Sequence, residues 1–316
     1  MALKLVSQKD CALNRLVYFL DRFGAHPYLL DSVFHWPGAS KYLAGLIDDY
    51  KGRVILAVGE NGDISGLIAF QNRKWDSDFW GWPVGTIDYF YVVNGAVGEE
   101  TAGILAKEVG DWAEDRRIRF VSGKVYPNAK ISKALEDNEF YKVIDEFRLS
   151  KKLTDWDLMK EPDKRIRYFQ PNDLDDLLRI AEKAPWAARF HSDSHFKKER
   201  ADSFYVSWLR NAVGRSDAKI TVFENDGRPA GFVVWSCKRI PTGDLVGDQE
   251  LVAIDPVIRG RGLGKILYRG VLSEMRRADV DLVETVIAAE NAPALHIQKK
   301  LGLEPNYKIS VFHRFN

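Results

Sequence analysis

Residues 249–267 read QELVAIDPVIRGRGLGKIL, and this stretch predicts a strand, a glycine-rich turn and the start of a helix. Leu251–Ile254 is a short apolar run that ends at Asp255 before a proline, so we expect the strand to stop there. Apolar residues then recur every four positions from Leu263 to Met275, which is the spacing of one helix face. The arginines and glycines of this stretch therefore fall in the turn that begins the helix.

This turn has the composition of a diphosphate-binding site. A helix N-terminus offers unpaired N–H groups and a partial positive charge. Gly260 and Gly262 let the backbone approach a phosphate and adopt positive φ, and Arg259 and Arg261 add charged donors. The alternative is an ordinary helix start with two solvated arginines. The strand, turn and helix in sequence favour the anion site.

Two motifs resemble those of a known family. The pattern Arg259-x-x-Gly262-x-Gly264 resembles the acetyl-CoA pyrophosphate loop of the GNAT N-acetyltransferases. Residues 291–303, NAPALHIQKKLGL, resemble the Asn-x-x-Ala helix of that family, which ends in Leu-Gly-Phe. The resemblance covers roughly residues 165–316 and implies acetyl-CoA as co-substrate, with no metal.

The resemblance also implies that two neighbouring strands splay apart and let the pantetheine arm pair with the backbone near Leu251–Ile254. The residues implied to hold the donor are Leu251, Val252, Ile254, Arg259, Gly260, Arg261, Gly262, Leu263, Gly264, Lys265, Asn291, Ala294 and Gln298.

The chain also repeats itself. Two strand–turn–strand patterns carry strand glycines at Gly66 and Gly231, which are 165 positions apart. Two further pairs lie 163 positions apart: Asp10 with Asp173, and Asn128 with Asn291. We therefore predict an α/β fold of mixed sheets in two tandem GNAT-like domains, spanning residues 1–150 and 165–316, joined by a linker at 151–164.

The first domain departs from the donor-site pattern. Its equivalent stretch, Val93–Leu105, has no arginine, and Glu99 and Glu100 would repel a phosphate. We expect a degenerate domain that does not bind CoA. Its role is either to shape the acceptor cleft or to stabilise the other half.

A narrower resemblance concerns the acceptor. Trp75–Gly81 (WDSDFWG) and Arg189–Phe196 (RFHSDSHF) resemble segments of sugar-nucleotide N-acetyltransferases such as TDP-fucosamine acetyltransferase. This implies a primary amine on an amino-sugar nucleotide as acceptor. The candidate contacts are Trp75, Arg189, His191 and Asp193. The alternatives are a packed aromatic turn for the first segment and a polar loop capping the next helix for the second.

N-acetylation requires a neutral amine, so a carboxylate base is useful. Asp248 and Glu250 precede the donor strand and are two residues apart, hence on one face of an ideal strand. Either is a candidate base, although solvated carboxylates at a strand end are the alternative. A strand N–H near Val252 is expected to hold the oxyanion.

In the family a tyrosine on the last helix usually protonates the leaving thiolate. Counting from Asn291, the corresponding residue is Gln298, which cannot be that acid. Tyr307 is the candidate catalytic substitute, and Tyr268 and His296 are alternatives. A thiol of pKa about 8.5 is also a tolerable leaving group without an acid.

Composition limits the remaining possibilities. The 46 Lys and Arg residues balance 45 Asp and Glu residues, which argues against nucleic-acid partners. No apolar run has the length of a membrane span, no signal peptide is evident, and the two cysteines are far apart. We expect a cytoplasmic protein without membrane partners. Oligomeric state stays open.

Two other functions compete with an acetyltransferase. Fem-like aminoacyl transferases also carry tandem GNAT-like domains, but they use aminoacyl-tRNA, and the intact Arg259–Gly264 loop and even charge argue against that donor. A non-catalytic acyl-CoA-sensing module is the second alternative, and Gln298 in place of tyrosine is its main support.

Overall fold

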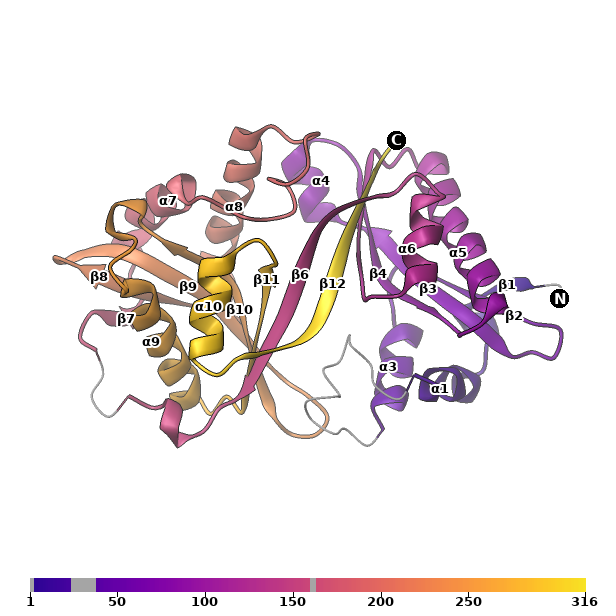
Figure 1. Ribbon diagram of the computed structural model, residues 1–316, viewed down its shortest axis with the longest axis horizontal. Helices are drawn as coiled ribbons and strands as arrows, with labels where there is room; N and C mark the ends of the chain where they lie inside the picture. Colours follow the sequence, from indigo (N-terminus) through magenta and orange to yellow (C-terminus); the bar gives the residue numbers. More distant parts are fainter. Residues whose placement is uncertain (1–2, 24–37, 160–162) are drawn as a thin grey trace. The chain divides into compact units, whose positions relative to one another are not determined.

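The computed structural model describes residues 3–23, 38–159 and 163–316, which form two compact α/β units (Figure 1). Unit 1 comprises residues 1–145 and 308–316, and unit 2 comprises residues 146–307. These bounds differ from the expected 1–150 and 165–316. The last nine residues belong to unit 1, and residues 151 and 152 of the expected linker lie in a strand.

Unit 1 is built on a sheet with the strand order β1-β2-β3-β4-β5-β12, in which only β4 and β5 are parallel. Its elements are β1 (Lys4–Ser7), η1 (Gln8–Asp10), α1 (Leu13–Asp21), α3 (Ala39–Asp48), β2 (Arg53–Val58), β3 (Ile64–Asn72), α4 (Lys74–Trp80), β4 (Val84–Val92), α5 (Ala96–Asp115), β5 (Phe120–Val125), α6 (Ala129–Glu136) and the first residues of β6 (Tyr141–Lys152).

Unit 2 repeats this design with the strand order β6-β11-β10-β9-β8-β7, and its one parallel pair is β10 with β11. Its elements are η2 (Asp155–Asp157), β7 (Ile166–Tyr168), η3 (Pro171–Asp173), α7 (Leu174–Lys183), α8 (Lys198–Val213), β8 (Ala218–Asn225), β9 (Arg228–Arg239), β10 (Leu245–Ile254), η4 (Pro256–Ile258), α9 (Leu263–Arg277), β11 (Leu282–Ala288), α10 (Ala292–Lys300) and the first residues of β12 (Glu304–Phe315).

The two units share an irregularity as well as an element order. In β4 the pairing with β3 skips Asp88, and in β10 the pairing with β9 skips Glu250. These two bulge residues are 162 positions apart in the chain. Asn128 and Asn291 each cap the helix that follows the parallel pair. A matching bulge and a matching cap support the duplication predicted from the sequence.

The units exchange their final strands. Residues Ser310–Phe315 of β12 pair with β5 in unit 1, whereas Glu146–Lys152 of β6 pair with β11 in unit 2. The exchange reaches the cores, because Phe312 is fully buried in unit 1 and Leu149 is fully buried in unit 2. Each unit is therefore completed by a strand that the sequence repeat assigns to the other half.

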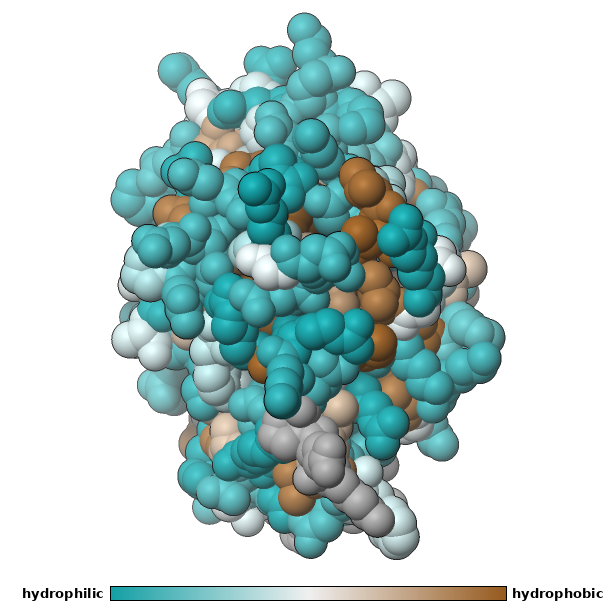
Figure 2. Space-filling model, turned by 90° about the vertical axis from the view of Figure 1, so that its left-hand side faces the viewer, coloured by the Kyte–Doolittle hydropathy of each residue, from teal (hydrophilic) through white to brown (hydrophobic). Residues whose placement is uncertain are grey.

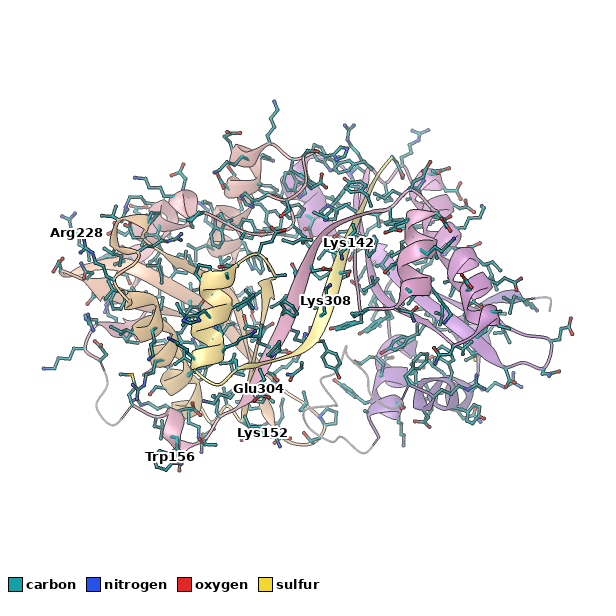
Figure 3. All side chains as sticks on the ribbon, viewed as in Figure 1. Lys142, Lys152, Trp156, Arg228, Glu304 and Lys308 are labelled. Carbon is teal, nitrogen blue, oxygen red and sulfur yellow. The ribbon has the colours of Figure 1, made fainter. Side chains whose placement is uncertain are left out.

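A polar cluster fixes the exchanged strand in unit 1. Asp145 of β6 accepts hydrogen bonds from Lys142, from Lys308 and from Ser310, at 2.7 to 2.9 Å. Figure 3 labels Lys142 on β6 and Lys308 on β12. Burial opposes ionisation of Asp145, but the hydrogen bonds outweigh it and hold its pKa below the ordinary value.

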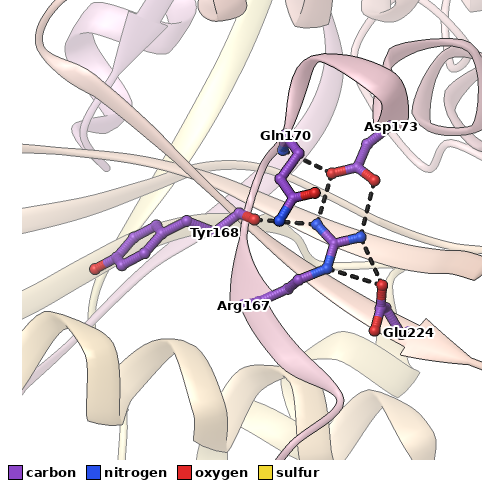
Figure 4. Close-up of polar contacts among 5 residues, drawn as sticks. All are labelled: Arg167, Tyr168, Gln170, Asp173 and Glu224. Carbon is purple, nitrogen blue, oxygen red and sulfur yellow. Dashed lines mark hydrogen bonds and ion pairs between the residues drawn. The ribbon is translucent and has the colours of Figure 1, made fainter. Parts of the chain in front are cut away.

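An arginine network closes the edge of unit 2 (Figure 4). The Arg167 guanidinium donates to both oxygens of Asp173 at 2.7 and 2.8 Å and to Glu224 at 2.6 and 2.8 Å. It thereby ties β7 to the start of α7 and to β8. Because the Arg167 guanidinium donates to these two carboxylates, the network holds the fold together and is not a ligand site.

The helix predicted after the glycine turn forms as α9. Leu267, Val271 and Met275 are fully buried against the sheet of unit 2, which confirms the predicted face. Seen from the side of β7 and β8, the surface of unit 2 is mostly hydrophilic with a narrow band of hydrophobic side chains (Figure 2). Among the described residues, no helix is both long and apolar enough to cross a membrane.

The strand exchange predicts where two core substitutions act. Phe312→Ala should weaken amide-exchange protection in β5 and α5 of unit 1, although it lies at the end of the chain. Leu149→Ala should weaken protection in β11 and α10 of unit 2. Each change removes a buried side chain and should cost about 2–5 kcal/mol. Hydrogen-exchange mass spectrometry checks both, and loss of protection in the opposite unit would contradict the exchange.

Candidate functional site

The parallel strands β10 and β11 of unit 2 separate before their ends. Pairing between β10 and β11 ends at Gln249–Thr285, yet β10 continues along β9 to Ile254 and β11 continues along β6 to Ala288. The Asp255 N–H bonds to Ala230 of β9 at 2.9 Å. Because backbone groups alternate along a strand, the N–H and C=O groups of Val252 and Ile254 point to the opposite, open edge.

The glycine turn follows the open edge after the short helix η4. Gly260 and Gly262 have φ of +79° and +74°, a region that favours glycine, and Gly262 caps α9 without a side-chain hydrogen bond. The first N–H groups of α9 are therefore available to an anion. Gly264 packs closely, because a Cβ there would lie 3.0 Å from Ile254.

Two side chains hold the turn in place. Asp255 accepts from the Val257 N–H at 3.0 Å and from Arg179 at 2.8 Å. The Arg259 Nε donates to the Ile254 carbonyl at 3.2 Å, which places this guanidinium beside the end of β10. Partial burial lowers the pKa of Arg259, and the charge of Asp255 opposes that shift.

The second predicted helix starts at the end of β11. Asn291 caps α10 by accepting from the Ala294 N–H at 3.3 Å. Gly302, with φ of +87°, follows the end of this helix, where a left-handed residue is common. Arg261 precedes the N-cap Gly262, and Leu263 and Lys265 lie in the first turn of α9. Apart from Gln298 near the end of α10, the predicted donor residues thus lie at the two helix starts and along β10.

Gln298 is buried against Gln249, the last residue of β10 that pairs with β11. Its Nε2 donates to the Gln249 Oε1 at 2.7 Å, and both side chains are almost fully buried. Thr285 donates to the Gln249 carbonyl at 3.2 Å. Gln249 Nε2 and Gln298 Oε1 have no hydrogen-bond partner among the described residues. Exchanging N and O in both amides would still leave one donor and one acceptor unsatisfied.

Asp248 has a carboxylate neighbour on the next strand. It stands opposite Glu284 in the β10–β11 register, and Glu284 is 4% exposed whereas Asp248 is half-buried. Burial raises the pKa of Asp248 to about 7, and the charges of Glu284 and Glu250 add to the rise while Lys238 and Arg148 oppose it. A carboxyl group poised near neutral pH is suited to proton transfer.

Glu250 is engaged differently from Asp248. Both of its oxygens accept from Arg215, at 2.7 and 2.9 Å, and Arg215 also donates to Asp217. These bonds raise the pKa of Arg215 and neutralise Glu250 at the bulge of β10. Of the two predicted bases, Asp248 has the environment of a base and Glu250 has that of an ion-pair partner.

The predicted acceptor residues of unit 2 lie in the segment before α8. Each contacts another residue of that segment or a residue of α8. His191 Nε2 lies 2.8 Å from Asp202, and Asp193 accepts from the backbone and ring of His195 at 2.9 Å. The Arg189 guanidinium lies 4.6 Å from the Phe190 ring. These contacts suit the alternative of a polar loop before α8, and contact with an acceptor stays a prediction.

Three other predicted residues lie on elements other than β10. Trp75 lies on α4 in unit 1 and stacks on Phe79, with ring centroids 6.1 Å apart. Tyr307 lies on β12 in unit 2. Tyr268 is buried on α9, where desolvation raises its pKa. The described residues contain no group of three or more side chains arranged to hold a metal.

Unit 1 has the open strand edge but a different turn. Pairing of β4 with β5 ends at Ile87–Gly123. Only residues 93–95 connect β4 to α5, whereas residues 255–262 connect β10 to α9. A Cβ at Gly98 would also collide with the Val93 carbonyl. The short, tightly packed connection explains why this half has no counterpart of the arginine–glycine loop.

Sequence reasoning missed Glu284, Gln249 and Arg215. A signal existed for one of them, because Glu284 interrupts the otherwise apolar run LVETVIA of β11. The other two are recognisable only once the register brings β10 against β11 and against the end of α8.

Comparisons with known proteins agree with this geometry. The profile of the acetyltransferase (GNAT) family matches residues 180–303. The uncharacterized N-acetyltransferase MJ1207 of Methanocaldococcus jannaschii is 30% identical over 141 residues, which cover 44% of this chain and 60% of that protein. A putative ribosomal protein bS18-alanine N-acetyltransferase of Bacillus subtilis is 30% identical over 146 residues, covering 44% and 80%.

A mycothiol acetyltransferase of Tsukamurella paurometabola is 39% identical over 139 residues, covering 43% of this chain and 46% of that protein. The chain therefore spans less than two thirds of the length of two of these three relatives.

Solved structures extend the likeness to the whole chain. A GCN5-related N-acetyltransferase from Sphaerobacter thermophilus covers 99% of this chain and 95% of its own, with a TM-score of 0.65 and 14% identity. A tandem GNAT protein from the clavulanic acid biosynthesis pathway covers 99% and 98%, with a TM-score of 0.58 and 14% identity. These structures share the fold. Together with the sequence matches in unit 2, they show that the chain belongs to the acetyltransferase (GNAT) family.

Proposed function

We propose that this protein is an acetyl-CoA-dependent N-acetyltransferase that transfers the acetyl group directly to a primary amine in a ternary complex. The observation that carries the proposal is the open edge of β10, which is followed, after the short helix η4, by the glycine turn at the start of α9. An extended donor with a diphosphate at one end requires both features in this order.

The residues present fit such a donor. The N–H groups at the start of α9, with Arg259, Arg261 and Lys265, offer positive charge for phosphates. Val252 and the N–H of Ile254 offer backbone groups to an amide-containing arm, as an added strand would use them, whereas the Ile254 carbonyl already accepts from Arg259. When bound, acetyl-CoA supplies an activated acyl group and a thiolate leaving group.

The acceptor side requires a base. Asp248 takes a proton from the incoming ammonium, and the neutral amine then attacks the acyl carbon. The Val252 N–H is the strand donor available to the carbonyl oxygen as negative charge develops on it. Glu250 keeps Arg215 at the bulge and thereby supports the shape of β10.

Departure of the thiolate proceeds without an acid at position 298. Gln298 has no ionisable proton, and its amide is bonded to Gln249 instead. A thiol pKa of about 8.5 makes the thiolate a tolerable leaving group. Tyr307 stays a candidate acid from the sequence.

The acceptor class rests on resemblance. Two matching relatives are named for amines of amino acids, the bS18-alanine N-acetyltransferase and an L-2,4-diaminobutyric acid acetyltransferase of Nocardia farcinica. The segments at Trp75 and at Arg189, His191 and Asp193 keep an amino-sugar nucleotide as the first acceptor to test. Each of these acceptors presents an aliphatic primary amine.

An acyl-CoA-sensing module is the second candidate, and the buried Gln298 favours it. Such a module would bind acetyl-CoA without turning over any amine. A Fem-like aminoacyl transfer has less support, because the arginine–glycine loop suits a diphosphate.

Titration calorimetry with acetyl-CoA tests the donor site. Arg259→Ala should weaken binding by at least about tenfold, since a charge-assisted hydrogen bond is worth about 1.5–3 kcal/mol. Gly262→Asp should weaken it further, because it adds negative charge and strains a backbone with φ of +74°. Arg228→Ala, an exposed arginine at the β8–β9 turn, is the matched control and should bind as wild type does.

Absence of binding to the wild type would remove the acetyl-CoA proposal. Unchanged binding of acetyl-CoA in both loop variants would show that its binding site lies outside this turn. Binding without turnover across a broad amine panel would favour the sensing module.

The Gln249–Gln298 bond predicts a non-additive stability effect. Gln298→Met alone leaves the Gln249 amide buried without its partner and should cost about 1–3 kcal/mol. The double variant Gln249→Met/Gln298→Met removes both amides at similar volume and should cost less than the two single changes added together. Urea unfolding of the four proteins measures the difference, and additive losses would show that the amides do not interact.

A further inference from the structure

We propose that Glu284 is part of the base: Asp248 and Glu284 hold one proton between them, and this carboxyl pair receives the ammonium group of an aliphatic amine acceptor. The proposal rests on the acetyltransferase function proposed above and deepens it. It adds a residue that neither the sequence motifs nor the family resemblance assigns.

The sheet brings the two carboxyl groups together. Asp248 and Glu284 are direct partners in the parallel β10–β11 register, four residue pairs long, so their side chains project from the same face. Glu284 is buried, whereas Asp248 is half-buried and hence the member that an acceptor can contact. The pair sits one residue before the strands separate, beside the edge proposed for the donor.

The surrounding charges compensate the pair incompletely. Glu284 forms long ion pairs with Lys238 of β9, at 3.6 Å, and with Arg148 of β6, at 3.8 Å, and both distances exceed that of a hydrogen bond. The Lys238 side chain is 69% exposed, so water weakens its effect. Glu250 of β10 adds negative charge, but Arg215 neutralises it.

Glu284 Oε2 has no hydrogen-bond partner among the described residues. A buried carboxylate and a half-buried one side by side, with only long ion pairs to compensate them, resist ionising together near neutral pH. The proposed state of the pair therefore carries about one negative charge. The raised pKa of Asp248, caused by burial and then by Glu284, agrees with this geometry.

The proton balance of the transfer follows. An alkylammonium is attracted to the single negative charge and gives one N–H proton to the pair. The freed nitrogen lone pair forms the C–N bond, the C–S bond breaks, and its electron pair leaves on sulfur. This first proton then passes from the pair to water. The nitrogen gives up its second proton, which ends on the CoA thiolate, so the products are the neutral amide and the CoA thiol. An acceptor that is uncharged at neutral pH, such as an arylamine, gains nothing from this arrangement.

A purely structural role would not favour a glutamate here. Two like charges in a buried site oppose folding, and a neutral amide of the same shape would relieve them. Glu284→Gln should therefore fold at least as well as wild type above neutral pH. Retaining a destabilising charge is the usual mark of a functional carboxyl pair.

The first test needs no substrate. A raised carboxyl pKa means that the folded state holds more protons than the unfolded state between about pH 4 and pH 7, so stability falls as pH rises through this window. Urea unfolding should show this decline in wild type and a smaller decline in Glu284→Gln. Glu304→Gln, an exposed glutamate on β12 labelled in Figure 3, should decline as wild type does.

The second test follows the reaction with acetyl-CoA and a panel that begins with an amino-sugar nucleotide and continues with glucosamine, ethanolamine and glycine, with aniline as the uncharged comparison. The acid limb of kcat/KM should lie near pH 7 in wild type. It should move down by about one pH unit or more in Glu284→Gln. Asp248→Asn should reduce kcat/KM by about 10²–10⁴-fold.

The outcomes separate this inference from the proposed function. Equal pH dependence of stability in wild type and Glu284→Gln shows that no proton is shared, which overturns the inference alone. A shared proton with an unmoved acid limb shows that the pair is not the base, with the same consequence. Aniline turned over as fast as the alkylamines overturns the acceptor class. Failure of acetyl-CoA to bind overturns the proposed function and this inference together.

Discussion

The candidate site of unit 2 depends on the point at which the pairing between β10 and β11 ends. Beyond the Gln249–Thr285 pair, the described residues of β10 and β11 do not pair with each other. Each strand stays paired with its other neighbour, β10 with β9 and β11 with β6. Unpaired N–H and C=O groups of a strand favour a hydrogen-bonding ligand, because leaving them without a partner costs free energy. The separation thus creates a binding edge, and the bulge at Glu250 and the glycine turn beyond Ile254 determine what can occupy it.

Unit 1 shows that the open edge alone does not make a donor site. It has the same bulge at Asp88 and the same end to its parallel pairing, but its turn has three residues where unit 2 has eight. The exchanged strands give this half a further role, because β12 completes unit 1 and β6 completes unit 2. The stability of the donor site therefore depends on a strand that begins in the first half of the sequence.

The sequence predicted the parts that depend on local chemistry. The turn at Arg259–Gly264, the cap at Asn291 and the buried face of α9 follow from residue types and spacing. The exchange of β6 and β12 could not be predicted, because either strand suits either sheet by its pattern alone. The roles of Glu284 and Arg215 depend on contacts with β10 residues 36 and 35 positions away in the chain, which no local motif encodes. The linker expected at 151–164 was wrong at its start, because strand β6 runs through Lys152.

The most direct test of the central claim is hydrogen exchange at the two open strand edges with and without acetyl-CoA. If the donor pairs with β10 and its phosphates bind the turn before α9, the ligand should slow exchange in residues 251–265. It should leave the corresponding edge of unit 1, residues 89–96, unchanged. Slowed exchange at residues 89–96, or none at residues 251–265 under saturating acetyl-CoA, would contradict the account.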